Sequence, residues 1–129
     1  MPAYVLSLGA IAGMLAVLLG AFGAHALHIR LDSYTLGIYN TAVQYQFFHA
    51  LALIAVGLSM RLRVQSVRLL TVSAYCFTVG IIFFCGSLYL LALGGPRWLG
   101  PVTPFGGLCF AAGWFCLALA GWKQCDDRI

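Results

Sequence analysis

Residues 37–60 read GIYNTAVQYQFFHALALIAVGLSM and contain no Asp, Glu, Lys or Arg. About 20 such residues are enough for a helix to cross the hydrocarbon core of a bilayer. Three more stretches of comparable length are equally free of charge: Met1–Leu27, Leu69–Leu93 and Pro104–Trp122. The pattern predicts an all-α polytopic membrane protein, with four transmembrane helices in a compact bundle over about residues 4–27, 37–60, 69–93 and 104–122.

The composition agrees with this interpretation and limits the kind of function. The 129 residues are 63% hydrophobic and only 8% charged, whereas soluble domains contain about 25% charged residues. Four spans and their short connections use the whole chain, so we expect a single domain over residues 1–129. Because no length is left for a soluble catalytic module, any function must reside in the bundle, at its two rims or on a partner.

The basic residues predict the orientation of the chain. With four spans, the connection after the second helix lies on the same side as both termini. That side carries five of the seven Lys and Arg residues, and the opposite side carries only Arg30 and Arg97. The positive-inside rule therefore predicts a multi-pass protein with both termini in the cytoplasm. The five residues are Arg61, Arg63, Arg68, Lys123 and Arg128.

Small residues form stripes that predict close helix packing. At 100° per residue, the glycines of the first stretch fall on one face, and a second small-residue face lies in the fourth stretch. Small residues let helix backbones approach closely in a membrane, so we expect packing within the chain, a homo-oligomer, or an accessory subunit of a membrane complex. The glycines assigned to packing are Gly9, Gly13, Gly20, Gly23, Gly86, Gly106 and Gly113.

His49 lies near the middle of the second stretch, where an ionisable group is costly and marks a site or a packing contact. Tyr45 precedes it by one helical turn, so the hydroxyl and the imidazole could meet on one side of the helix. The leading prediction is a non-enzymatic protein that binds a partner or a lipid-like ligand through a polar pocket around His49. The candidate ligand-binding residues are His25, Gln44, Tyr45, Gln46, His49, Ser87 and Tyr89.

An alternative prediction is a metal- or proton-handling protein that uses His25 and His49. Together with His28 and Asp32 they would supply three imidazoles and a carboxylate, a set suited to a transition metal. No tight ligand spacing supports that set, and the five cysteines form no C-x-x-C pair. There is also no G-x-S-x-G or H-E-x-x-H motif. The sequence thus predicts no catalytic residue and no cofactor, and does not decide whether a metal, a lipid or a quinone binds.

Four short motifs carry a resemblance to a known family. They are GAFGAH at 20–25, YQFFHA at 45–50, FCGSLY at 84–89 and TPFGG at 103–107. The last motif also predicts a helix start, with Thr103 as the N-cap and Pro104 in the first turn. In this order they resemble the domain-of-unknown-function 423 family of small bacterial inner-membrane proteins, related to eukaryotic transmembrane protein 256. The resemblance implies a four-helix protein of the bacterial inner membrane, and it implies no catalytic residues.

Overall fold

The fold comes from a computed structural model, which describes residues 1–62 and 66–126. Two of the basic residues used for the orientation, Arg63 and Arg128, lie outside the described residues. The described chain forms the helices α1 (Pro2–Phe22), α2 (Ser33–Arg61), α3 (Val67–Gly80), α4 (Gly86–Ala92) and α5 (Val102–Asp126). Four helical segments are long and apolar enough to span a membrane: Pro2–Leu27, Ser33–Arg61, Val67–Ala92 and Arg97–Lys123.

Two of the four segments contain a π-helical turn. The turn η1 (Gly23–Leu27) extends α1, and η2 (Ile81–Cys85) joins α3 to α4 into one continuous span. A short 3₁₀ turn, η3 (Arg97–Leu99), follows the glycine-rich connection after α4. π turns are rare and often occur at functional sites. Hydropathy does not reveal them, because a π turn changes the hydrogen-bond register and not the polarity of the residues.

α2 begins at Ser33, earlier than the uncharged stretch, because Asp32 caps it. The Asp32 carboxylate accepts a hydrogen bond from the Thr35 backbone N–H at 2.7 Å, which satisfies one of the free donors at the helix start. Hydrogen bonds from the Thr35 side chain and backbone hold the pKa of Asp32 below its ordinary value. The cap is therefore ionised and in place at neutral pH, and is lost only as the pH falls through that lowered pKa.

The prediction that Thr103 is the N-cap of the last helix is wrong. α5 begins at Val102, so Thr103 and Pro104 lie within its first turn. Thr103 is instead bonded to the preceding span, because its hydroxyl lies 2.6 Å from the Ser87 hydroxyl. The Ser87 hydroxyl also donates to the Phe84 carbonyl at 3.0 Å, so Thr103 is the donor of the pair. This contact ties the start of α5 to the junction of η2 and α4.

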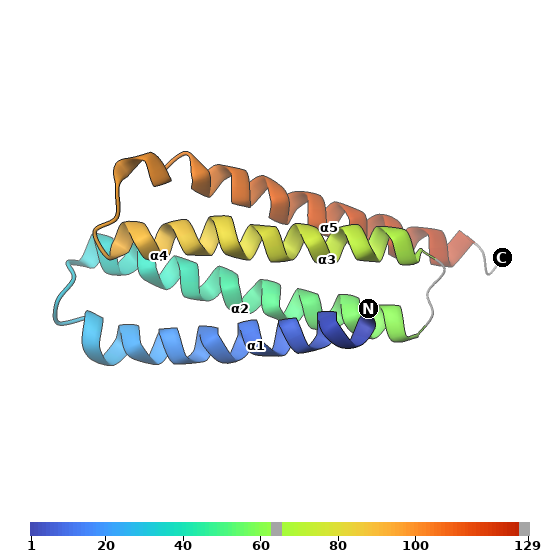
Figure 1. The fold of residues 1–129 in the computed structure, drawn as a ribbon, viewed down its shortest axis with the longest axis horizontal. Helices are drawn as coiled ribbons and strands as arrows, with labels where there is room; N and C mark the ends of the chain where they lie inside the picture. Colours follow the sequence, from blue (N-terminus) through green and yellow to red (C-terminus); the bar gives the residue numbers. More distant parts are fainter. Residues whose placement is uncertain (63–65, 127–129) are drawn as a thin grey trace.

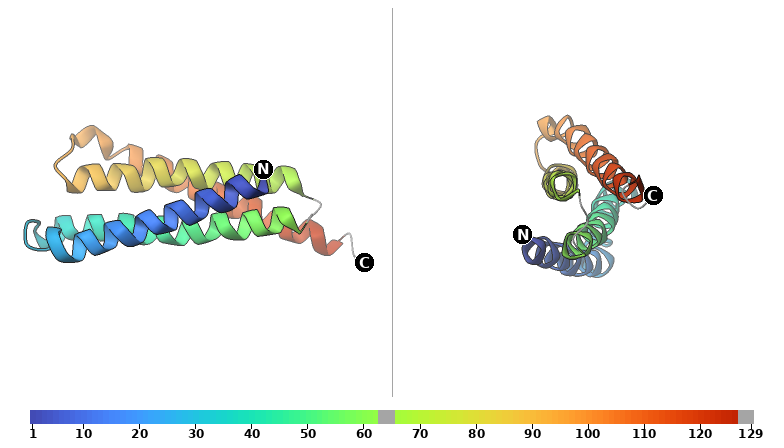
Figure 2. Two further views of the ribbon diagram at one scale, coloured as in Figure 1. Left: turned by 60° about the horizontal axis from the view of Figure 1, so that its bottom comes forward. Right: turned by 90° about the vertical axis from the view of Figure 1, so that its right-hand side faces the viewer.

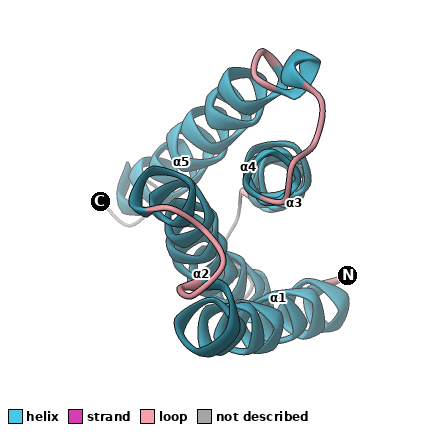
Figure 3. Cartoon of the chain, turned by 90° about the vertical axis from the view of Figure 1, so that its left-hand side faces the viewer, coloured by secondary structure: helices cyan, strands magenta, loops and turns pink. Residues whose placement is uncertain are grey.

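The start of α1, the end of α2, the start of α3 and the end of α5 lie toward the same end of the molecule (Figure 1). α2 is the central element: α1 packs chiefly on α2, and α5 packs chiefly on α3 and η2. End-on views place α1 and α5 on opposite sides of the molecule, with α2 and α3 between them (Figures 2 and 3). The arrangement leaves α1 held by a single helix along most of its length.

The small-residue face of α1 packs against α2 in the same chain. A Cβ at Gly9 would lie 2.9 Å from the Ala50 carbonyl oxygen, and one at Gly23 would lie 2.6 Å from the Tyr39 ring. Gly13 and Gly20 approach α2 less closely, at 3.7 Å from Ala50 and 3.2 Å from a methyl of Val43. The whole stripe is thus used within the monomer.

The second small-residue face joins α5 to α3 and η2. Gly106 lies against the Phe84 backbone, and Gly113 lies against the Phe77 ring. At the same place the buried Ser73 hydroxyl donates to the Gly113 carbonyl oxygen at 2.9 Å. Of the glycines assigned to packing, Gly86 is the exception, because a Cβ there would meet no atom within 4 Å. The two small-residue faces therefore stabilise the fold of one chain, and neither is left free for a neighbour.

Candidate functional site

The polar residues of α2 divide between two sides of the helix. Gln46 and His49 are both buried, at 5% exposure each. Gln46 bonds to α1 and α4, whereas His49 bonds to α5. The expected single pocket around His49 is therefore replaced by two separate polar centres, and each has its own surroundings.

Gln46 links three helices by hydrogen bonds. Its Nε2 donates to the Ala12 carbonyl oxygen of α1 at 2.9 Å, and its Oε1 accepts the Tyr89 hydroxyl of α4 at 2.7 Å. Tyr89 packs edge-on against the ring of Tyr39, whose hydroxyl donates to the Leu19 carbonyl at 2.6 Å. Bonds of this kind hold helices together in a membrane, where no water competes for the polar groups.

A groove opens beside Gln46, between α1 on one wall and α3, η2 and α4 on the other. We call it the lateral groove. Its first section, of about 320 Å³, is lined by Gln46, Tyr89 and mostly aliphatic side chains, among them Ile11, Leu15 and Ile82.

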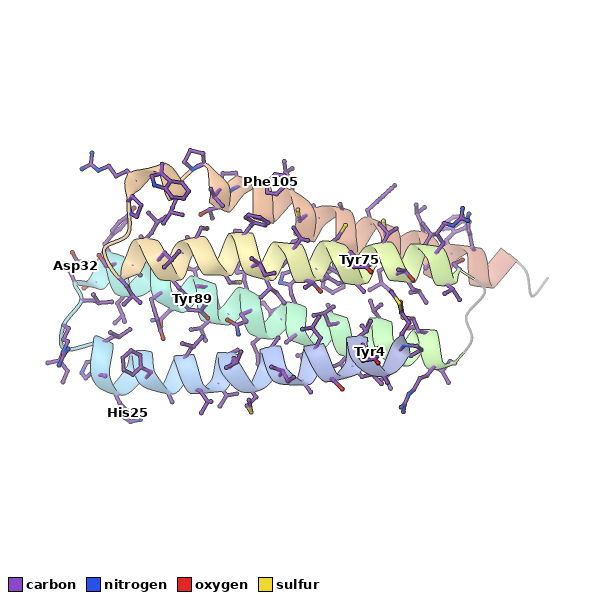
Figure 4. The ribbon with its side chains drawn as sticks, in the orientation of Figure 1. Tyr4, His25, Asp32, Tyr75, Tyr89 and Phe105 are labelled. Atoms are coloured by element: carbon purple, nitrogen blue, oxygen red, sulfur yellow. The ribbon has the colours of Figure 1, made fainter. Side chains whose placement is uncertain are left out.

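A second section of about 270 Å³ runs toward the end of the molecule that carries the termini, past Tyr4 and Tyr75 (labelled in Figure 4). Leu8, Leu53 and Thr78 line both sections, so the two form one continuous groove. Among the described residues, no Asp, Glu, Lys, Arg or His side chain lines either section. The lateral groove is therefore a long, mostly apolar surface in which Gln46 and Tyr89 form a hydrogen-bonded polar pair.

His49 faces away from this groove, and both of its ring nitrogens are bonded. Nδ1 lies 2.7 Å from the Tyr45 carbonyl oxygen, and the Trp114 indole N–H donates to Nε2 at 3.2 Å. A carbonyl oxygen can only accept, so Nδ1 carries the proton and Nε2 is the acceptor. The geometry defines a neutral imidazole with no nitrogen free for a metal or for proton transfer.

Aromatic rings enclose the His49 side chain. Its ring is stacked on Phe110 with centroids 3.5 Å apart, and Phe77 and Trp114 pack at 5.6 and 6.1 Å. Tyr45 also stacks on His49 at 5.9 Å. The bond between them involves the Tyr45 carbonyl and not the hydroxyl, which corrects the expected hydroxyl–imidazole contact. This centre is a packed junction between α2, α3 and α5.

The remaining histidines lie apart from His49. His25 in η1 and His28 after it are exposed, as is Asp32, and Figure 4 shows His25 pointing away from the other helices. Among the side chains described, those of residues 1–62 and 66–123, no group of three or more His, Cys, Asp or Glu could hold a metal ion. The hypothesis that three histidines converge on one site is therefore not supported by the geometry.

The other candidate residues also separate. Gln44 and Tyr45 are exposed on the outer surface of α2, whereas Ser87 is buried and bonded to Phe84 and Thr103. Of the seven ligand-binding candidates, only Gln46 and Tyr89 line the lateral groove.

The sequence interpretation missed Trp114 and the role of Gly86. An indole in the middle of an apolar helix was a usable signal for Trp114, since its N–H needs a partner. No comparable signal identified Gly86, which lines the lateral groove and leaves space there instead of packing against a helix.

Comparison with known proteins decides the family. Residues 19–107 match the family described as Protein of unknown function (DUF423). The chain belongs to the DUF423 family. It is 40% identical over 116 residues to a UPF0382 membrane protein of Staphylococcus haemolyticus, with 90% of this chain and 93% of that protein covered. It is also 40% identical over 118 residues to the UPF0382 inner membrane protein YgdD of Escherichia coli, with 92% and 88% covered. No solved structure matches.

The family expected from the four motifs is thereby confirmed, as is the membrane character of this DUF423 protein. The structure gives the motifs distinct roles. Residues 20–25 reach into the π turn η1, residues 45–50 carry both Gln46 and His49, and residues 84–89 include the groove residues Gly86 and Tyr89. In this DUF423 chain, the same short segment of α2 thus serves two unrelated contacts.

Proposed function

We propose that this DUF423 protein is a non-enzymatic protein of the bacterial inner membrane that binds a lipid-like ligand in the lateral groove. The observation that carries the proposal is the groove itself, two connected sections of about 320 and 270 Å³. Ligand pockets in proteins measure about 300–1,000 Å³ and are mostly apolar with few polar groups. The pair Gln46–Tyr89 is such a polar group.

A ligand chain fits this groove better than a partner helix. A helix is about 10–12 Å across with its side chains, and close helix packing in membranes relies on small residues. Here the walls carry large side chains such as Ile11, Leu15 and Ile82, while the small-residue faces are already used inside the chain. A homo-oligomer or a complex with a larger partner would have to form through bulky side chains.

The proposal includes the orientation with both termini in the cytoplasm. Of the basic residues described, Arg61, Arg68 and Lys123 lie at the ends of spans that point to the same side as the termini. Arg30 and Arg97 lie at the connections on the opposite side. Basic residues in short flanking segments favour the cytoplasmic face.

Filling the groove tests the proposal. In Gly86→Leu the new side chain meets no atom at its Cβ and projects from a residue that lines the groove. We expect this variant to fold and to lose at least about nine-tenths of the lipid that co-purifies with the wild type, since the occupied volume is no longer free. Native mass spectrometry of protein extracted gently from its own membranes measures bound lipid and subunit number together.

Gly121→Leu is the matched control. Gly121 also meets no atom within 4 Å, but it lies on α5, away from the groove. Both changes replace helical glycine by leucine, so both raise helix propensity by about the same amount. The control should keep its lipid. Equal retention by the two variants, or wild-type protein with no lipid at all, would contradict the proposed function.

A further inference from the structure

The ligand of the lateral groove can be defined further, on the assumption that the groove binds a lipid-like molecule as proposed above. Burying an apolar chain there gains nothing from the hydrophobic effect, because the surrounding lipid tails are equally apolar. Selection of one lipid over the bulk must therefore come from the polar groups on the groove wall. Apart from Met1 and the exposed Tyr4 and Tyr75 at the terminal end, and from the Cys85 thiol, which is only a weak donor, these are the side chains of Gln46, Thr78 and Tyr89.

Of the hydrogen-bond donors on these three side chains, one has no acceptor among the described residues. The Thr78 hydroxyl donates to the Ala74 carbonyl at 2.8 Å, and the Tyr89 hydroxyl donates to Gln46. The Gln46 amide nitrogen carries two N–H groups. One donates to the Ala12 carbonyl, and we find no acceptor for the other among the described residues. A side chain that is only 5% exposed thus holds an N–H available to a ligand in the groove.

Depth restricts which ligand can use this donor. Gln46 lies near the midpoint of the 29-residue helix α2, and Ala12 lies near the middle of the span Pro2–Leu27. The hydrocarbon core is about 30 Å thick, so the donor is about 15 Å from either interface. The ester carbonyls and head groups of phospholipids and diacylglycerols remain at the interfaces. The acceptor must therefore belong to a molecule whose polar part can enter the hydrocarbon core.

The absence of charged side chains from the described groove wall restricts the ligand further, to one whose polar part is uncharged. In the part of the chain that the structure describes, no acidic or basic side chain lines the first section of the groove, where it could neutralise a charged head group. An uncompensated charge at this depth is costly. The ligand therefore combines a neutral ring or head bearing a carbonyl oxygen with a long apolar chain. Isoprenoid quinones have this chemistry, since the head is uncharged, carries carbonyl acceptors and lies within the hydrocarbon core.

We propose that the lateral groove binds an isoprenoid quinone, with a quinone carbonyl accepting the second N–H of Gln46. The prenyl chain extends between α1 and α3, past Thr78 toward the section lined by Tyr4 and Tyr75. The bond to Gln46 selects the quinone over other neutral lipids, and the shape of the groove holds the chain.

Binding of a decyl-substituted benzoquinone to the purified full-length protein in nanodiscs of synthetic phosphatidylcholine tests this proposal. Decylbenzene, which has the same chain and no carbonyl, and dioleoylglycerol, whose carbonyls stay at the interface, are the comparison ligands. The wild type should bind the quinone about tenfold more tightly than decylbenzene, as one hydrogen bond of about 1.4 kcal/mol implies. Quinone binding no tighter than that of decylbenzene or dioleoylglycerol would overturn the proposal.

Gln46→Glu removes only the free donor. A carboxyl at this depth stays protonated, because its ionised form is costly in the membrane. Its O–H can replace the bond to Ala12, and its other oxygen can still accept the Tyr89 hydroxyl. We expect quinone affinity to fall about tenfold, while decylbenzene affinity is unchanged. Unchanged quinone affinity in a folded variant would overturn the assignment.

Nuclear magnetic resonance of the wild type provides a test that needs no variant. The two Nε2 protons of Gln46 resonate separately, and the quinone should shift the proton that is not bonded to Ala12. No shift at saturating quinone would contradict the proposal. Failure of the quinone assignment can be told apart from failure of the proposed function. If the wild type binds decylbenzene as tightly as the quinone, and Gly86→Leu no longer binds decylbenzene, only the quinone assignment is overturned. No binding of any ligand overturns the proposed function as well.

Discussion

Replacing Gly9 by alanine is expected to lower the free energy of unfolding by about 1–3 kcal/mol, the usual cost of overpacking a close contact. A methyl group at Gly9 would lie 2.9 Å from the Ala50 carbonyl oxygen and 3.0 Å from the Ile54 backbone nitrogen. Both are backbone atoms of α2, so only a shift of the helices relieves the clash. Unfolding in detergent, followed by circular dichroism, measures the loss.

Gly13→Ala is the matched control one turn further along α1. Its methyl group would lie 3.7 Å from the Ala50 Cβ, an ordinary contact. The control variant should be as stable as the wild type or slightly more stable, because alanine favours the helix over glycine. Equal stability of the two variants would show that α1 does not pack on α2 through this seam.

His49→Leu is expected to lower the free energy of unfolding by about 1–3 kcal/mol, the cost of leaving a buried hydrogen-bonding group without its partner. The substitution removes the acceptor of the Trp114 indole N–H and the ring stacked on Phe110. Because His49 faces away from the lateral groove, the variant should keep its bound lipid. Chemical unfolding and native mass spectrometry of one preparation measure both properties.

A double-mutant cycle with Trp114→Phe isolates the hydrogen bond. Once the indole N–H is absent, His49→Leu should cost less, with a coupling energy of about 0.6–1.7 kcal/mol as found for hydrogen bonds between membrane helices. A stable His49→Leu variant that has lost its lipid would reverse the assignment of the two sides of α2.

The four spans and the packing glycines of α1 and α5 were predictable, because both follow from local rules. Length and the absence of charge specify a membrane helix, and glycine spacing at 100° per residue specifies a close face. The same arithmetic places His25 away from the face of Gly9 and Gly13, and Figure 4 shows His25 pointing away from the other helices.

The division of α2 between two sites was not predictable in the same way. Gln46 and His49 are one turn apart, and helix periodicity groups them within about 60° of one another. Which of them meets α1 and which meets α5 depends on how those helices cross α2, and this is a property of the tertiary fold. Gly86 illustrates the same limit, because a glycine next to an open groove and one in a close contact have the same local sequence signal.

The most direct test is photo-cross-linking in the native membrane, with a diazirine amino acid at position 82 or at position 115. Ile82 lines the lateral groove, whereas Phe115 lies on α5, and their exposures are similar at 60% and 65%. Mass spectrometry then identifies the molecule attached at each position. Position 82 should capture one neutral, long-chain lipid, and position 115 the mixed phospholipids of the bulk membrane. The same phospholipid mixture at both positions, or a protein captured at position 82, would contradict a ligand site in the lateral groove.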